Sequence, residues 1–157
     1  DDARPNGPLA KSQARLAAVQ ALYQMDMAGT DLPEVIDEFK AHRIGESAEG
    51  RAIAGADAEH FARILQGVVR RQKDLDPVID GQLASGWSLV RVDAILRAIL
   101  RAGAFEVMEE ADVPVRVVIN EYVDVAHAFF AADEPRVVNG VLDGLARKLR
   151  PGALSAR

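Results

Sequence analysis

Cysteine is absent from the 157 residues, so the chain has no disulfide, no cysteine nucleophile and no thiolate metal ligand. This absence is typical of a reducing compartment, and we expect a cytoplasmic protein. Aromatic residues make up only 5% of the chain, which is few for a β-rich core. No run of about 18 uncharged apolar residues occurs, so we expect no membrane span and no membrane partner. The N-terminal residues do not have the pattern of a signal peptide.

Motifs for catalysis, cofactors and metals are also missing. No Gly-Lys-Ser/Thr phosphate loop, His-Glu-x-x-His pair or Gly-x-Ser-x-Gly elbow occurs in the sequence. The carboxylates of Asp74, Asp76 and Asp80 are close in sequence, but Asp76 precedes a proline at a helix start and the other two suit a solvated face. The residues therefore predict a protein that binds a partner, with no enzymatic activity, no cofactor and no metal.

The pattern of apolar residues predicts an all-α protein of about seven helices. Alanine is the commonest residue and the best helix former. Apolar residues recur at spacings of three and four, as in Leu9, Leu16, Tyr23 and Met27 of the first helix. The expected helices start near Pro8, Asp31, Asp57, Pro77, Ser88, Pro114 and Pro135. Residues 113–119 and 137–142 are rich in β-branched side chains, but helical spacing continues through both, so we expect no strand.

The sequence also predicts the domain bounds and shows an uneven distribution of charge. We expect a flexible tail over 1–8, a helical domain over 9–150 with a mobile loop at 42–56, and a C-terminal tail over 151–157. The formal net charge is −5. Residues 134–157 carry a net positive charge, so one end of the molecule can face an anion. We expect Gly103 and Gly140 to allow neighbouring helices to approach closely.

Three blocks of sequence carry more specific information. They are Ala14–Gln24, Ile99–Glu106, and a third block containing Asp112-Val113-Pro114, Val118–Glu121 and Arg136–Asp143. In this order and spacing they resemble the NusB family of bacterial transcription antitermination factors over about residues 9–150. The resemblance implies a compact all-α fold of two packed three-helix subdomains, with a break near 74–88. It also implies binding of single-stranded boxA RNA in ribosomal RNA leaders, together with the ribosomal protein NusE, in a complex of RNA polymerase and other Nus factors that suppresses premature termination.

The resemblance assigns the binding residues. Those expected to bind RNA are Lys11, Arg15, Gln20, Tyr23, Arg101, Phe129 and Asp133. Those expected to bind the protein partner are Phe130, Arg136 and Val137. Cationic side chains suit phosphates, and rings suit splayed bases. Family members often carry an arginine-rich run before the first block, of which only Lys11 and Arg15 remain here, and this predicts modest RNA affinity without the partner. Phe130 stands where glycine is usual, and Val137 where an aromatic residue is frequent.

Several of the RNA assignments have a structural alternative. Tyr23 and Phe129 lie on apolar stripes and can belong to the core. Arg101 can pair with Asp112 or Glu106 at the surface. Asp133 can cap the last helix. If Lys11 and Arg15 are surface contacts, replacing both with Glu weakens RNA binding and leaves the thermal melt almost unchanged.

Two other functions remain open at this point. NusB-like RNA-binding domains occur in ribosomal RNA cytosine methyltransferases, ahead of a catalytic half. We prefer a free-standing factor because these residues contain no Gly-rich strand–turn–helix segment. The acidic net charge also fits a helical protein-interaction module without RNA binding. The apolar stripes look alike whether they face a core or a second copy of the chain, so a homodimer is also left open.

Overall fold

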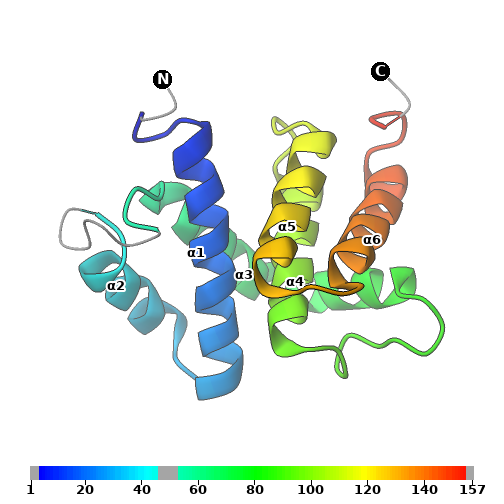
Figure 1. The fold of residues 1–157 in the computed structure, drawn as a ribbon, viewed down its shortest axis with the longest axis horizontal. Helices are drawn as coiled ribbons and strands as arrows, with labels where there is room; N and C mark the ends of the chain where they lie inside the picture. The colour runs from blue at the N-terminus through cyan, green and yellow to red at the C-terminus, as the bar shows by residue number, and fades with distance from the viewer. Residues whose placement is uncertain (1–3, 46–52, 155–157) are drawn as a thin grey trace. The chain divides into compact units, whose positions relative to one another are not determined.

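The computed structural model describes residues 4–45 and 53–154, and these residues form six α-helices and no strand. The helices are α1 (Pro8–Ala28), α2 (Leu32–His42), α3 (Ala58–Gln82), α4 (Ala94–Glu109), α5 (Val115–Phe129) and α6 (Glu134–Leu149) (Figure 1). The predicted all-α class is confirmed. The chain divides into two compact units, Asp1–Val69 and Arg70–Arg157, and the division falls inside α3. No helix within the described ranges is both long enough and apolar enough to cross a membrane.

The first unit contains α1, α2 and the beginning of α3. The buried side of α1 is made largely of alanines, which let neighbouring elements approach closely. Phe39 of α2 stacks on Phe61 of α3 with ring centroids 5.3 Å apart. Leu9, Tyr23 and Met27, which recur at helical spacing in the sequence, are not on the buried side of α1, because all three are exposed. The alanine-rich face has taken the buried position, and it leaves these larger side chains on the outside.

The segment between α2 and α3 is described only at its two ends. Ile44 and Ile53 are buried, and the Gly45 N–H donates to the Ala54 carbonyl at 2.7 Å. The ends of this segment are therefore held together. Residues 46–52, on which most of the expected mobile loop falls, lie outside the described residues, as do parts of the two expected tails.

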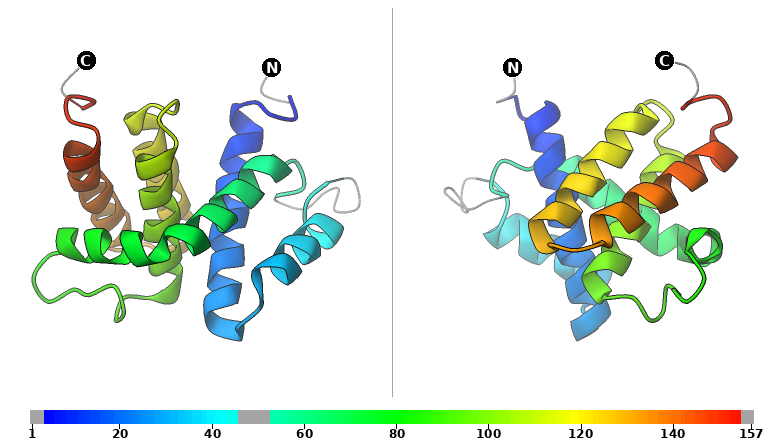
Figure 2. Two further views of the ribbon diagram at one scale, coloured as in Figure 1. Left: turned by 180° about the vertical axis from the view of Figure 1, so that it is seen from behind. Right: turned by 45° about the vertical axis from the view of Figure 1, so that its right-hand side comes forward.

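The second unit contains the end of α3 with α4, α5 and α6 (Figure 2). A Cβ added to Gly103 of α4 would lie 2.8 Å from Cδ1 of Leu142 on α6. The expected close approach at Gly103 is therefore confirmed. The same expectation for Gly140 is wrong, because a Cβ there would meet nothing within 4 Å.

Helix α3 continues through Pro77, where the sequence predicted a break and a new helix. A proline inside a helix removes one backbone hydrogen bond and costs about 3 kcal/mol. Leu75 and Ile79, on either side of Pro77, are fully buried. The apolar surface that they bury offsets this local cost and keeps the two turns in one helix, so residues 4–45 and 53–154 form six helices where about seven were expected.

Helix α4 starts at Ala94, six residues after the expected start at Ser88. Its N-cap is Asp93, whose side chain accepts the Ile95 N–H at 2.7 Å. The preceding loop, residues 83–93, has its own fixed structure. Buried Leu89 donates its N–H to Asp80 Oδ1 at 2.9 Å, and Nη1 of Arg97 donates to the carbonyls of Leu89, Val90 and Val92.

Gly103→Ala and Gly140→Ala provide a matched test of the α4–α6 packing. Both substitutions add the same methyl group to a helix and gain the same propensity, up to about 1 kcal/mol. Only Gly103→Ala also crowds Leu142, and overpacking costs about 1–3 kcal/mol. We expect urea denaturation to show Gly103→Ala as the less stable variant by about 1–3 kcal/mol. Equal stabilities would show that the two helices are not in close contact at Gly103.

Candidate nucleic-acid interface

The four candidate residues on α1 fall on two different sides of the helix. At 3.6 residues per turn, Lys11 and Arg15 are about 40° apart around the axis. Gln20 lies about 180° from Lys11, and Tyr23 about 120° from it. The helix therefore brings Lys11 and Arg15 together, and Gln20 and Tyr23 together. It does not bring all four onto one face.

Lys11 is held by a carboxylate at the start of α3. Its Nζ lies 2.7 Å from Oδ2 of Asp57, and its side chain is 36% exposed. Asp57 also accepts the His60 N–H at 3.1 Å and donates its own N–H to the Ala10 carbonyl. Asp57 therefore caps α3, whose start was predicted near this residue, and also ties α3 to α1. A phosphate that binds Lys11 has to compete with Asp57.

The pKa of Asp57 reflects opposing effects. Burial by itself raises the pKa, but the hydrogen bonds from Lys11 and from the His60 N–H, with the positive charge of Lys11, outweigh it and lower the pKa below its usual value. The carboxylate is therefore the favoured form in the folded protein.

Arg15 is buried, with 3% of its surface exposed. A glutamate at this position would bury a negative charge in place of the positive charge of arginine. Burial of a charge that its surroundings do not match lowers the stability of the fold considerably. The burial of Arg15 contradicts the premise that both residues are surface contacts, and we now expect the double replacement of Lys11 and Arg15 by Glu to lower the melting temperature. The double replacement would also remove the Lys11–Asp57 ion pair.

Arg101 of α4 is paired with Asp76 of α3. Its Nε and Nη2 donate to the two oxygens of Asp76, each at 2.9 Å, and its side chain is 15% exposed. The sequence alternatives for this partner, Asp112 and Glu106, are wrong. Glu106 is fully buried and accepts the hydroxyl of Tyr122. The Asp76 carboxylate fixes the guanidinium in one orientation and offsets its charge.

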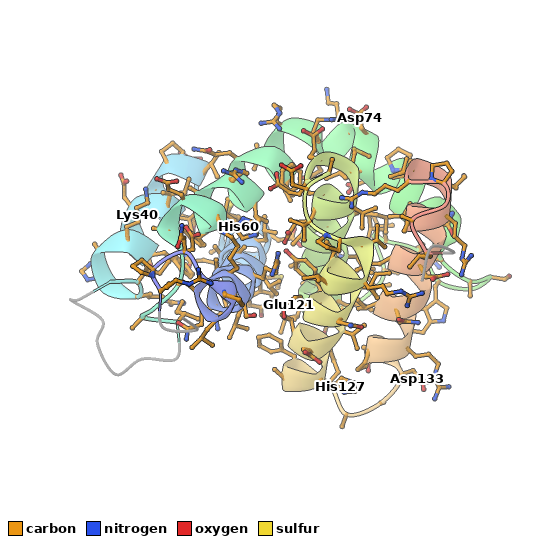
Figure 3. The ribbon with its side chains drawn as sticks, turned by 90° about the horizontal axis from the view of Figure 1, so that it is seen from above. Lys40, His60, Asp74, Glu121, His127 and Asp133 are labelled. Atoms are coloured by element: carbon orange, nitrogen blue, oxygen red, sulfur yellow. The ribbon has the colours of Figure 1, made fainter. Side chains whose placement is uncertain are left out.

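The remaining candidate residues lie at the turn between α5 and α6 and in the first turn of α6. Phe129 ends α5 and is exposed, and Phe130 follows it. Asp133 is the N-cap residue of α6, yet its side chain makes no capping hydrogen bond, so it is not held to the helix. Figure 3 shows Asp133 at this turn, beyond the α5 residue His127. These side chains belong to the second unit, whereas Lys11, Arg15, Gln20 and Tyr23 belong to the first.

A cleft of about 410 Å³ opens next to this turn and involves residues that the sequence did not single out. We name it the Trp87 cleft. It is lined by Gln82, Leu83, Ala84, Trp87, Asp133, Arg136, Val137, Gly140 and Val141. Three of the ten candidates therefore share this cleft with the only tryptophan of the chain. The sequence signal that could have pointed to Trp87 is that it is the single tryptophan of a chain poor in aromatic residues. The cleft itself could not be predicted, because its lining residues come from two segments far apart in sequence.

The sequence is similar to a known protein family over most of its length. The profile of the NusB family matches residues 12–147. The transcription antitermination protein NusB of Allorhizobium ampelinum is 52% identical over 92% of this chain and 90% of that protein. The chain belongs to the NusB family. The resemblance carried by the three sequence blocks is confirmed.

Solved structures of NusB proteins have the same fold. NusB from T. maritima matches with a TM-score of 0.75 and 25% identity, covering 92% of this chain and 96% of that one. A crystal structure of antitermination factors NusB and NusE in complex with dsRNA matches with a TM-score of 0.72 and 24% identity over 87% of this chain and 96% of that one. As a NusB family member, the chain is not an enzyme: its curated relatives are named for transcription antitermination.

The Lys11–Asp57 pair predicts a pH-dependent stability. Because the pKa of Asp57 is lowered on folding, the pair contributes stability above the unfolded-state pKa of about 3.9, and this contribution is lost as the pH falls through the folded-state pKa. Asp57→Asn keeps the N-cap acceptor but removes the charge. We expect chemical denaturation to show wild type more stable than Asp57→Asn at pH 7, with the gap closing below about pH 4.

Asp37→Asn on α2 removes an exposed carboxylate and serves as the control, with little effect expected at either pH. A gap between wild type and Asp57→Asn that stays constant from pH 7 to pH 2.5 would contradict the assigned ion pair.

Proposed function

We propose that this NusB family chain is a transcription antitermination factor that binds single-stranded boxA-type RNA in ribosomal RNA leaders together with NusE. In this role it helps RNA polymerase, with other Nus factors, to pass sites of premature termination. The proposal requires no catalytic step and no cofactor. It assigns the protein to the cytoplasm, where bacterial transcription takes place.

The observation that carries the proposal is the similarity to curated antitermination proteins. About half of the residues are identical over some nine-tenths of both chains, as in the relatives from Allorhizobium ampelinum and Rhizobium rhizogenes. These relatives are named as antitermination proteins and not as methyltransferases, which favours the free-standing factor over a domain of a methyltransferase. The complex of NusB and NusE with dsRNA supports RNA and NusE as the partners to test.

Each unit offers side chains of the kinds that bind RNA. Phe129 offers an exposed ring for stacking, and Lys11 and Arg101 offer cations. Both cations are already paired with carboxylates, so RNA gains less from each of them than from an unpaired cation. Modest affinity of the protein alone is therefore expected, and NusE supplies the remaining contacts.

The proposed NusE contacts lie in the second unit, which also carries some of the RNA candidates. Phe130, Arg136 and Val137 follow one another around the turn into α6, and the loop 83–93 adds Val90, which is strongly exposed. Arginines and large apolar side chains are frequent at the centres of protein interfaces. A helical interaction module without RNA binding would use the same surface, and the RNA titration separates these two functions.

Titration of a fluorescently labelled boxA RNA tests the proposal directly. We expect the protein alone to bind with a Kd weaker than nanomolar at physiological salt and NusE to tighten binding in a ternary complex. Fluorescence anisotropy with and without NusE measures both. Nanomolar binding by the protein alone would contradict the expected modest affinity, and absence of RNA binding in the presence of NusE would contradict the proposed function.

Lys11→Gln and Lys40→Gln test the proposed phosphate contact on α1. Both remove one lysine from the first unit, but Lys40 lies on the exposed side of α2 (Figure 3). Loss of one phosphate contact to a single strand lowers the log–log salt slope by about 0.7, which corresponds to about fourfold in affinity at 0.15 M salt. We expect this loss for Lys11→Gln only. Equal effects of the two substitutions would remove Lys11 from the interface.

A further inference from the structure

The Trp87 cleft has a stacking surface that is available and fixed in place. Trp87 is 40% exposed and is one of the residues that line the cleft. The loop that carries it is held by buried Leu89, by the Asp80 carboxylate and by the three carbonyl contacts of Arg97. A ligand that stacks on Trp87 therefore pays little to order the loop.

The polar side chains of the cleft come from two helices, α3 and α6. Gln82 ends α3 and packs over Gly144 of α6, where a Cβ would collide with the Gln82 side chain. Asp133 and Arg136 come from the beginning of α6. An amide, a carboxylate and a guanidinium thus share one mostly apolar cleft with an indole ring.

These groups match a nucleobase better than an apolar side chain of a protein. A base has a flat face for the indole and a polar edge for the amide and the carboxylate, and the adjoining phosphate is negative, which suits Arg136. An apolar side chain would make no use of the charges of Asp133 and Arg136, which are exposed at the cleft. The volume of about 410 Å³ is large enough for one base.

We propose that the Trp87 cleft binds one unpaired base of the RNA, stacked on Trp87, with its edge on Asp133 and its phosphate near Arg136. The inference rests on the proposed function, because it assigns a subsite for the same RNA. It reassigns Arg136 and Val137, which line the cleft, from NusE to RNA and leaves Phe130 and Val90 as the proposed NusE contacts. It also gives the cleft a base preference. A carboxylate only accepts hydrogen bonds, so Asp133 favours bases with an exocyclic amino group over uracil, whose single N3–H donor lies between two carbonyls that repel the carboxylate.

Intrinsic fluorescence tests the proposal, because Trp87 is the only tryptophan of the chain. The full-length protein is titrated with the single-stranded hexamers A6, C6 and U6, and separately with boxA RNA in the presence of NusE, with Trp87→Phe as the blank. We expect A6 and C6 to quench the emission more strongly than U6. Asp133→Asn, which replaces an acceptor-only group with an amide that also donates, is expected to abolish this preference.

Substitutions provide the second measurement, by anisotropy of labelled boxA RNA with NusE. Trp87→Leu removes the ring and is expected to weaken binding about fivefold or more, whereas Trp87→Phe keeps a ring and most of the affinity. Arg136→Gln is expected to weaken binding and to lower the salt slope, and Lys148→Gln, at an exposed lysine on the same helix, is the matched control. Melting curves of the variants separate a lost contact from a lost fold.

The outcomes separate this inference from the proposed function. RNA binding with no change in Trp87 emission, and with Trp87→Leu equal to wild type, would overturn the cleft assignment and leave the proposed function intact. Quenching by NusE without RNA, with loss of NusE affinity in Trp87→Leu, would make the cleft a protein site and overturn the inference. Absence of RNA binding under all conditions would overturn both.

Discussion

Asp57 lies where α1 meets the first turn of α3, and its interactions hold the beginning of both helices. Its carboxylate binds Lys11 and caps α3 through the His60 N–H, while its own N–H reaches the Ala10 carbonyl. In the second unit, Asp76 plays a similar part for Arg101 with two hydrogen bonds. The cations proposed for RNA are thus part of the fold. This pairing fixes their positions but weakens their attraction for phosphate, which links the stability of each unit to its affinity for RNA.

Much of the fold could be predicted from the sequence, because helical spacing, alanine content and the stop at Gly29 are local signals. Gly29 ends α1 with a φ of +71°, which favours glycine. The errors came from positions where tertiary contacts outweigh local signals. Pro77 stays within α3 because its neighbours Leu75 and Ile79 are buried. Gly103 and Gly140 look alike in sequence, and only the packing against Leu142 distinguishes them.

The candidate site was predicted less completely than the fold. A resemblance transfers residue types to positions but does not give their exposure, so the burial of Arg15 and the carboxylate partner of Arg101 could not be foreseen. Trp87 was missed because its significance depends on Gln82 at the end of α3 and on Asp133 at the start of α6, which the fold brings to one cleft. Contacts between residues so distant in sequence leave no periodic pattern to read.

The central claim is that the turn into α6 and the Trp87 cleft contact unpaired RNA when NusE is present. Nuclear magnetic resonance of the ¹⁵N-labelled protein in the ternary complex tests it most directly, because the single tryptophan gives a single indole N–H signal. Comparison of the NusE complex with and without boxA RNA isolates the effect of the RNA. The account predicts RNA-induced shifts of the indole signal and of the backbone signals of residues 129–137. RNA-induced shifts that leave both sets unchanged would contradict it.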